Sequence, residues 1–248
     1  HLPSSWLAMM LPFAWRENDR IRRDGSALLV DEALAAGVPR FIQESFAPIY
    51  ADAGSRWIDE SSPVRPGRYN RSSLDAERSA QRFSASGGAG IVLRFAGFYG
   101  PDSRVLDEML PMVRRGISPL PGRPDAYWSS ISHDDAASAV AAVLRAPSGI
   151  YNASDDEPLT RAAWAGALAG ALGLATPRQM PRWAARLMGS IGEVLSRSQR
   201  TSNAKLRALG WTPRWPSARE GLRAALRDAE ASGVRGGIGP TMAGTRMT

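Results

Sequence analysis

Cysteine is absent from the 248 residues, and lysine occurs once, as Lys205. The lack of cysteine excludes disulfides, thiol nucleophiles and cysteine-ligated metals. Histidine is also scarce, with 2 residues in the chain, so ligands for a histidine-rich metal site are lacking and we expect no metal. No apolar run reaches the ~18 residues that a membrane-spanning helix needs, and no signal peptide is visible. These absences predict a globular protein with no membrane association, for which a cytoplasmic location is the default expectation.

Arginine supplies almost all of the positive charge. Lys and Arg together number 31 against 24 Asp and Glu, which gives a formal net charge of +7. The excess of basic residues lies in 177–248, and a basic segment of this kind is one feature of nucleic-acid-binding proteins. These arginines are spread along amphipathic stretches, are interrupted by Glu193, Glu220 and Asp228, and form no nucleic-acid-binding motif. We therefore expect no nucleic-acid partner, and interpret the charge as a solvated face or as a lobe that receives an anionic ligand.

The stretch 40–101 shows the organisation on which the fold prediction depends. It opens with an apolar-rich run at 41–45 and closes with the β-prone run 91–95. Between them, residues 69–77 are typical of the start of a helix. Strand, helix and strand in this order predict a βαβ crossover, the repeating unit of a parallel sheet covered by helices.

Helical periodicity and end signals predict further elements along the chain. Helices are expected at 15–37, 72–85, 105–116, 132–144, 161–172, 181–196 and 217–230, and strands at 127–131 and 150–153. Ser132 and Asp135 fit a capping box, and Thr160 fits the cap of the helix that follows it.

Several short motifs occur in a recognisable order. They are Ser45, Ile49-Tyr50-Ala51, Glu60, Pro63, Pro66, Tyr69, Glu77, Leu93-Arg94, Tyr99-Gly100-Pro101, His133-Asp134-Asp135, and Asn203 to Lys205 with Leu209-Gly210-Trp211 and Pro213. In this order and spacing they resemble the extended short-chain dehydrogenase/reductases, the NAD-dependent epimerase/dehydratase family. The resemblance runs from residue 1 to about residue 230.

The resemblance implies an α/β fold: a Rossmann-like parallel sheet flanked by helices, with a smaller, mostly helical substrate lobe. The implied division is 1–101 and 131–156 for the nucleotide-binding part, 102–130 and 157–232 for the substrate lobe, and 233–248 for a disordered tail. The family's first strands and its Gly-rich phosphate-binding turn have no counterpart in this sequence. We therefore expect the chain to be an N-terminally truncated fragment.

The catalytic residues of the family are only partly retained. In the family a Tyr acts as general acid/base, a Lys four residues later lowers its pKa from about 10, and a Ser or Thr hydroxyl binds the substrate oxygen. Here the Tyr is Tyr69, the Lys position is Ser73, and the hydroxyl position is Phe46, with Ser45 one residue away. Tyr69 and Ser45 are therefore the candidate catalytic residues of a degenerate site.

The resemblance also implies a cofactor, NAD or NADP, and a small-molecule substrate. Candidate cofactor-binding residues are His1, Leu2, Ser45, Tyr69, Phe95, Ala96 and Gly97. Arg104, Arg197 or Arg200 is expected either to meet a substrate diphosphate or to carry surface charge. The implied function is an NAD(P)-dependent oxidoreductase or epimerase acting on a nucleotide sugar or another carbonyl/alcohol substrate; the alternative is a non-catalytic NAD(P)-binding sensor or scaffold. The helices at 15–37 and 72–85 resemble the pair through which relatives form homodimers.

Overall fold

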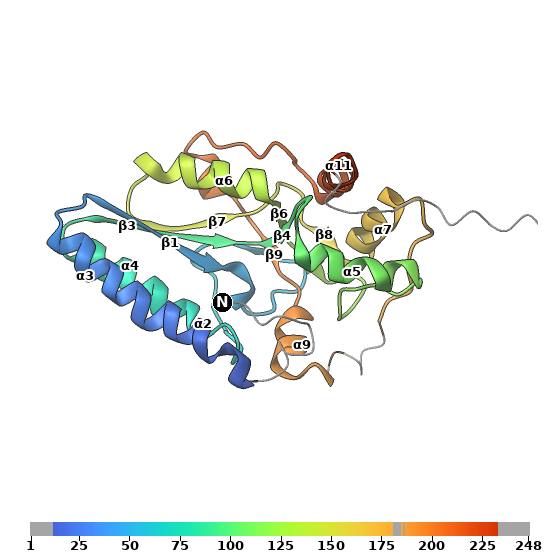
Figure 1. Ribbon diagram of the computed structural model, residues 1–248, viewed down its shortest axis with the longest axis horizontal. Coiled ribbons are helices and arrows are strands. Elements are labelled where there is room, and N and C mark those ends of the chain that lie inside the picture. The colour runs from blue at the N-terminus through green and yellow to red at the C-terminus, as the bar shows by residue number, and fades with distance from the viewer. Residues whose placement is uncertain (1–11, 181–184, 186, 233–248) are drawn as a thin grey trace, which may run out of the picture.

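The computed structural model describes residues 12–180, 185 and 187–232. Its main sheet has three parallel strands in the order β1-β3-β7: β1 is Arg40–Phe46, β3 is Ala89–Phe95 and β7 is Gly149–Ala153 (Figure 1). The register of β1 and β3 places Ser45 opposite Arg94. The prediction that the segments 41–45 and 91–95 are neighbouring parallel strands is confirmed.

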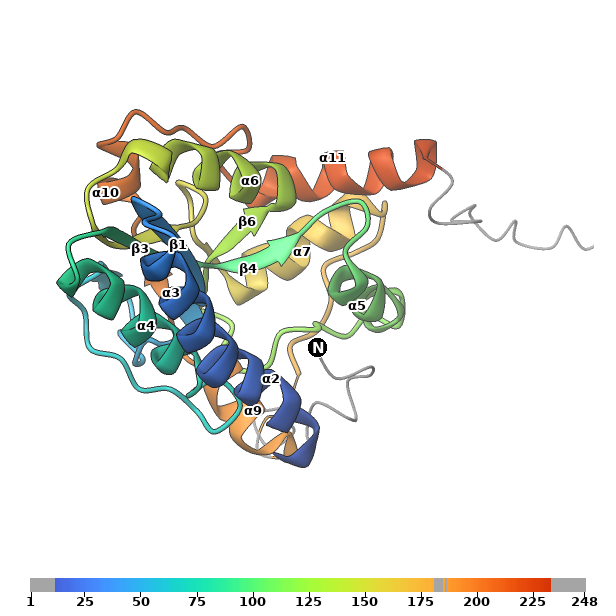
Figure 2. The same cartoon turned by 60° about the vertical axis from the view of Figure 1, so that its left-hand side comes forward.

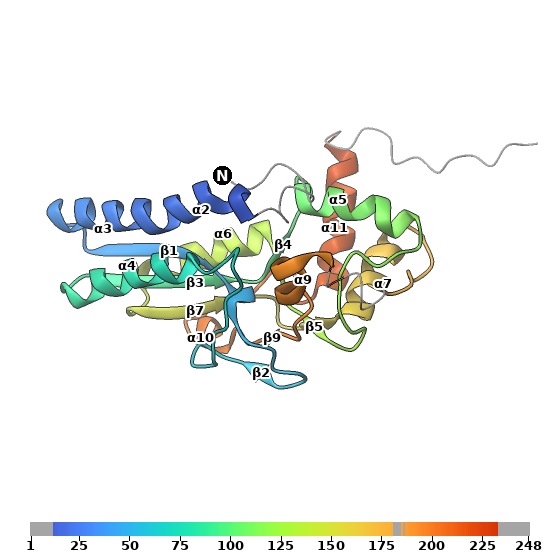
Figure 3. The ribbon, with the colours of Figure 1, turned by 90° about the horizontal axis from the view of Figure 1, so that it is seen from below.

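One long helical segment and α4 (Ser73–Ala85) cover the same face of this sheet. The long segment consists of α2 (Arg16–Arg20), a π-helical turn (Ile21–Gly25) and α3 (Ser26–Ala35), and it runs beside α4 (Figure 3). Gly37 adopts a φ of 64°, a left-handed conformation that ends the segment and turns the chain into β1. Both predicted helices are confirmed, and the π-helical turn is a feature that the sequence did not predict.

The opposite face of the sheet is covered by α6 (His133–Ala142) (Figure 1). Ala136, Ala139 and Val143 pack with Ile91 and Leu93 of β3 in one buried cluster. A 3-10 turn (Val143–Arg145) follows α6, and α10 (Ala204–Arg207) adds to the same cluster. The sheet is therefore buried on both faces, as expected for parallel strands.

A mostly helical region is attached to the carboxyl ends of the strands (Figure 2). Its helices are α5 (Arg104–Arg114), α7 (Arg161–Ala171), α9 (Gly189–Leu195) and α11 (Ala218–Ala231). Short strand pairs connect it to the sheet: β4 (Gly97–Tyr99) with β6 (Ser130–Ser132), β5 (Tyr127–Trp128) with β8 (Leu159–Thr160), and β2 (Trp57–Ile58) with β9 (Arg200–Thr201). Leu106, Trp164, Leu168 and Leu222 form part of its own buried cluster. The predicted residue limits of the two lobes stay a prediction, and the expected tail 233–248 lies outside the described residues.

The start of α6 is hydrogen-bonded to the segment that precedes α11. The Ser132 hydroxyl accepts a hydrogen bond from the Asp135 amide at 3.0 Å, which confirms the predicted cap. The Asp135 carboxylate also accepts from the backbone N–H groups of Arg214 at 2.5 Å and Trp215 at 3.2 Å. The motif His133-Asp134-Asp135 thus joins the segment before α11 to α6.

The closing signature has the same structural role. Asn203 donates to the Ser154 carbonyl at 2.8 Å, and Lys205 Nζ donates to the Ile150 carbonyl at 2.7 Å. Trp211 Nε1 donates to Ser138 Oγ at 2.9 Å, which joins this segment to α6. The signature residues therefore build the fold.

Candidate functional site

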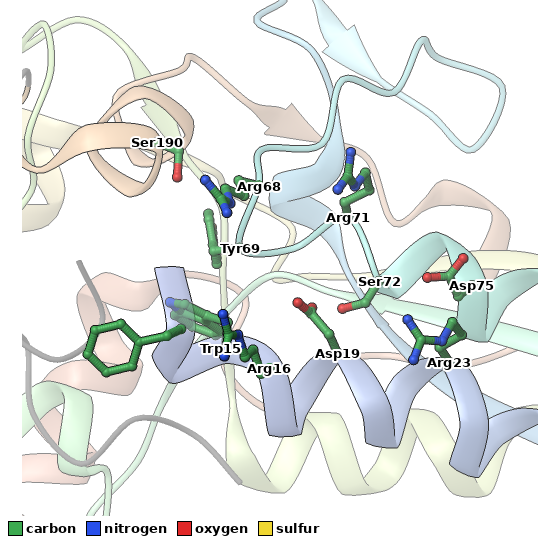
Figure 4. Close-up of a pocket in the computed structure, with 11 residues that line it drawn as sticks. Trp15, Arg16, Asp19, Arg23, Arg68, Tyr69, Arg71, Ser72, Asp75 and Ser190 are labelled. Atoms are coloured by element: carbon green, nitrogen blue, oxygen red, sulfur yellow. The ribbon is translucent and has the colours of Figure 1, made fainter. Parts of the chain in front are cut away.

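A cavity of about 410 Å³ lies between the start of the long helical segment and the turn that precedes α4 (Figure 4). Tyr69, the candidate catalytic residue, lies on its wall, and Ser72 lines it from the same turn. Asp19 lines it from the long segment, and Trp15 lines it from the residue just before that segment. The cavity therefore adjoins Tyr69, the residue at the position of the family's general acid/base.

Tyr69 is buried in an apolar cluster. Its side chain is 7% exposed, and its ring centroid lies 5.1 Å from that of Trp15. Ile191 and Val194 of α9 complete the cluster. The Tyr69 hydroxyl has no hydrogen-bond partner among the described residues.

The environment of Tyr69 holds the phenol in its protonated form. Burial raises the pKa of Tyr69 well above its usual range, and the positive charges of Arg197 and Arg22 only partly oppose this. A phenol with such a pKa stays neutral near pH 7. It can donate a hydrogen bond, but it cannot act as a base.

The position of the family's lysine is occupied by a short neutral side chain. Ser73 is the first residue of α4, is 1% exposed, and its hydroxyl has no described hydrogen-bond partner. No ammonium group therefore lies at this position to lower the pKa of Tyr69. Arg22 and Arg197 are the charges that influence the phenol, and sequence spacing gave no sign that either of them would act on Tyr69.

Ser45 belongs to a buried polar network at the end of β1. Its hydroxyl donates to Glu77 Oε1 at 2.6 Å. Glu77 in turn accepts two hydrogen bonds from the guanidinium of Arg94, at 2.8 and 2.7 Å, and both side chains are at most 5% exposed. The structure thus brings Ser45 to Glu77, and no hydrogen bond joins Ser45 to Tyr69 within the described residues.

The same network extends to the third strand of the sheet. Arg94 Nη1 donates to the Tyr50 hydroxyl at 2.8 Å, and that hydroxyl donates to Asn152 Oδ1 at 2.8 Å. Burial raises the pKa of Tyr50 to about 12, although the positive charge and the hydrogen bond of Arg94 favour the ionised form. The sequence offered a sign of this network, because Arg94 is a charged residue within an otherwise apolar strand.

The remaining candidate cofactor-binding residues differ in their surroundings. Phe95 and Ala96 are buried in the cluster beneath α6, at 5% and 1% exposure. Gly97 begins β4, and a Cβ atom there would lie 2.6 Å from the Trp128 ring, so glycine permits close packing. His1 and Leu2 lie outside the described residues.

Two of the arginines considered for a substrate diphosphate already have partners. Arg197 is buried and donates to the Tyr50 carbonyl at 3.3 Å, to the Arg65 carbonyl, and to Glu193 at 3.0 Å. The Arg200 guanidinium lies over the Trp57 ring at 4.0 Å from its centroid and near the Tyr127 ring at 4.9 Å. These contacts make both arginines structural links between segments that lie far apart in the sequence.

Residues 12–180, 185 and 187–232 contain no cluster of three or more His, Asp or Glu side chains that could hold a metal ion. Within the same described part of the chain, no helix has the length and apolarity that crossing a membrane requires.

Known proteins resemble this chain in sequence. A family model described as the NAD dependent epimerase/dehydratase family matches residues 18–154. A protein from a Streptomyces species named 3-diazoavenalumate denitrifying reductase is 35% identical over 221 residues, which is 85% of this chain and 73% of the relative.

Solved structures share the fold. The human epimerase family protein SDR39U1 (isoform 2), solved with NADPH, has a TM-score of 0.76 at 18% identity, covering 86% of this chain and 76% of that one. The dTDP-glucose 4,6-dehydratase DesIV from Streptomyces venezuelae, with NAD and TYD bound, has a TM-score of 0.71 at 23% identity, covering 89% and 69%.

These likenesses confirm the predicted Rossmann-like α/β fold. Together with the family match and the reductase relative, they show that this chain belongs to the NAD dependent epimerase/dehydratase family of extended short-chain dehydrogenase/reductases.

Proposed function

We propose that the protein is an NAD(P)H-dependent reductase of a small organic substrate, in which Tyr69 acts as a neutral hydrogen-bond donor. The observation that carries this proposal is the environment of Tyr69, whose hydroxyl is buried beside Trp15 without a described partner. The reductase relative at 35% identity supports reduction over epimerisation or dehydration.

The described residues fit one end of a nicotinamide dinucleotide. The hydroxyls of Tyr69 and Ser73 and the side-chain amide of Asn70 are buried and have no described hydrogen-bond partners. Such unpaired groups are costly unless a ligand completes them, and the ribose and carboxamide of a nicotinamide offer matching donors and acceptors. Tyr69 and Ser73 are the residues that would hold this end. When bound, NAD(P)H supplies a hydride.

The side chains around Tyr69 set what the site can do with protons. Trp15 and Ile191 exclude water from the phenol, and Ser73 brings no charge to it. The phenol keeps its proton and can stabilise a negatively charged or polar group by donating a hydrogen bond to it. The site therefore favours substrates that accept a hydride without needing fast proton delivery, such as a cationic or strongly polarised carbon.

Carbonyl substrates, including nucleotide sugars, require a proton donor at the same site. Reduction of a carbonyl leaves an oxyanion that a general acid must protonate, and general acid catalysis contributes typically about 10²–10⁴-fold. MoeE5, a structural neighbour at 22% identity, was solved with UDP-glucose and NAD. A nucleotide sugar is the second substrate class that we propose to test.

A non-catalytic NAD(P)-binding protein is the second candidate function. The presence of Ser73 favours this non-catalytic function, because the lysine that activates the family's tyrosine has no equivalent at this position. Such a protein would bind the cofactor and turn over neither substrate class.

The experiment mixes the complete protein with NADPH or NADH and with each substrate class, and follows the loss of reduced nicotinamide absorbance. An arenediazonium salt, chosen because the reductase relative is named for a diazo compound, and a nucleotide sugar are suitable first substrates. Reductase function predicts protein-dependent oxidation that Tyr69→Phe lowers about tenfold or less, while the control Tyr127→Phe leaves it unchanged. Cofactor binding without oxidation of either substrate would replace the reductase proposal with the sensor.

A further inference from the structure

The cavity beside Tyr69 carries an excess of positive charge. Arg16 lines it from the long helical segment, and Arg68 and Arg71 line it from the turn before α4 (Figure 4). All three side chains are exposed, and no carboxylate among the described residues forms an ion pair with any of them. Arginine suits carboxylate and phosphate groups because its guanidinium presents a planar fork of donors.

The acidic side chains of the cavity do not cancel this charge. Asp75 is already paired with Arg78, which lies on α4. Arg23, a fourth arginine on the cavity wall, is paired with Asp24. Asp19 is the remaining acid on the described wall, so three arginines without a carboxylate partner face one carboxylate.

Two buried hydroxyls lie on the same wall. Ser72 is 5% exposed and Tyr69 is 7% exposed, and neither hydroxyl has a hydrogen-bond partner among the described residues. Both residues line the cavity. An oxygen-rich anion in the cavity would accept hydrogen bonds from these hydroxyls. Arginines that are merely solvated on a surface would not be accompanied by buried hydroxyls without a partner.

Aromatic side chains also line the cavity. Phe13, Trp15 and Tyr69 line it, and Phe13 is 61% exposed. A cavity of about 410 Å³ that is lined by both aromatic side chains and guanidinium groups matches a small planar molecule with an anionic end.

We propose that this cavity binds the anionic end of an aromatic carboxylate or aromatic phosphate, with Arg68, Arg71 and Ser72 as its binding residues. The inference rests on the proposed function, because it makes this anion the substrate that lies against Tyr69. It narrows the substrate to molecules that carry both a ring and a carboxylate or phosphate.

The test is a calorimetric titration of the complete chain with benzoate, phenyl phosphate and the uncharged benzamide. We expect one of the two anions to bind and benzamide not to bind, and the tighter anion identifies carboxylate or phosphate as the recognised group. The double variant Arg68→Gln/Arg71→Gln should weaken anion binding about tenfold or more, because it removes charged hydrogen-bond donors.

The control is Arg223→Gln/Arg227→Gln, which removes the same charge from the exposed side of α11. Equal weakening in both double variants would show that net charge alone binds the anion, and this would overturn the inference. Absence of binding by both anions, or equal binding of benzamide, would overturn it as well. Ser72→Ala, which removes a hydroxyl and no charge, should also weaken binding; an unchanged affinity would remove Ser72 from the site.

A parallel titration with NADPH separates this inference from the proposed function. If NADPH binds and is oxidised while neither anion binds, the inference fails and the reductase stands. If the anion binds through Arg68 and Arg71 but NADPH does not, the reductase proposal fails and with it the substrate role of the anion.

Discussion

At the scale of single residues, Tyr69 and Tyr50 are both buried but differ in the hydrogen-bond partners of their hydroxyls. Both lie among buried side chains, and burial raises the pKa of each. The Tyr50 hydroxyl has Arg94 and Asn152 as partners, whereas the Tyr69 hydroxyl has none within the described residues. Tyr50 is therefore part of the fold, whereas the Tyr69 hydroxyl is the one that the proposed function pairs with a ligand.

The two tyrosines predict opposite effects on stability. Tyr69→Phe removes a buried hydroxyl without a partner, so we expect the free energy of unfolding to be unchanged or to rise by up to about 1 kcal/mol. Tyr50→Phe leaves Arg94 Nη1 and Asn152 Oδ1 without a partner, and should lower it by about 2–4 kcal/mol. Urea unfolding of the two variants and the wild type measures both effects. A larger loss in Tyr69→Phe than in Tyr50→Phe would contradict this account.

The raised pKa of Tyr50 also predicts a dependence on alkaline pH. The folded protein holds this proton up to about pH 12, and the unfolded chain loses it near pH 10. The contribution of the protonated Tyr50 to the free energy of unfolding is therefore fully present below about pH 10 and is lost as the pH rises toward about 12.

The check is urea unfolding at about pH 9.5 and about pH 11.5. The wild type should lose about 2 kcal/mol more between these values than Tyr50→Phe, because Tyr69 and Tyr99 are present in both proteins and cancel in the difference. Equal losses would show that Tyr50 titrates normally in the folded protein.

At the scale of elements, the sequence predicted the strands and helices better than it predicted the site. Alternating strand and helix signals identified β1, α4 and β3, because apolar runs and end residues are local features. The Glu77 to Arg94 ion pair was not predicted, because it joins residues from different elements. The close packing of Gly97 against Trp128 was missed for the same reason: the contact depends on the course of the chain through the second lobe.

The start of α6 gives a prediction at this scale. Ser132→Ala removes one cap and should lower the free energy of unfolding by about 1 kcal/mol. Asp135→Ala also leaves the amides of Arg214 and Trp215 without their acceptor, so its loss should be about 2–3 kcal/mol. Thermal and urea unfolding compare the two variants, and equal losses would mean that Asp135 does not hold the closing segment.

At the scale of the whole molecule, an apolar helical surface lies on the outer side of the sheet. Ile21, Leu28 and Leu29 on the long helical segment are 47%, 60% and 61% exposed. The segment lies beside α4 (Figure 3), and the sequence resemblance implied that this pair of helices forms a homodimer contact. Exposed apolar patches on a helix face are typical of interaction surfaces.

The homodimer is tested by sedimentation of the complete protein. We expect a dimer, and Leu28→Glu/Leu29→Glu should convert it to a monomer because two charges would be buried in the contact. Leu144→Glu/Leu187→Glu, which changes exposed leucines elsewhere, should leave the dimer intact. A wild-type monomer at high concentration would contradict the proposal.

In the function that we propose, Tyr69 keeps its proton while the protein reduces its substrate. The most direct measurement is the pH dependence of kcat/KM for NAD(P)H oxidation, made on the wild type and on Tyr69→Phe. We expect the pH profile to show no ionisation of Tyr69 between about pH 6 and about pH 9. We expect the variant to lose about tenfold or less in kcat/KM. An ionisation near neutrality that disappears in Tyr69→Phe, with a loss of about 10²-fold or more, would contradict the proposed function.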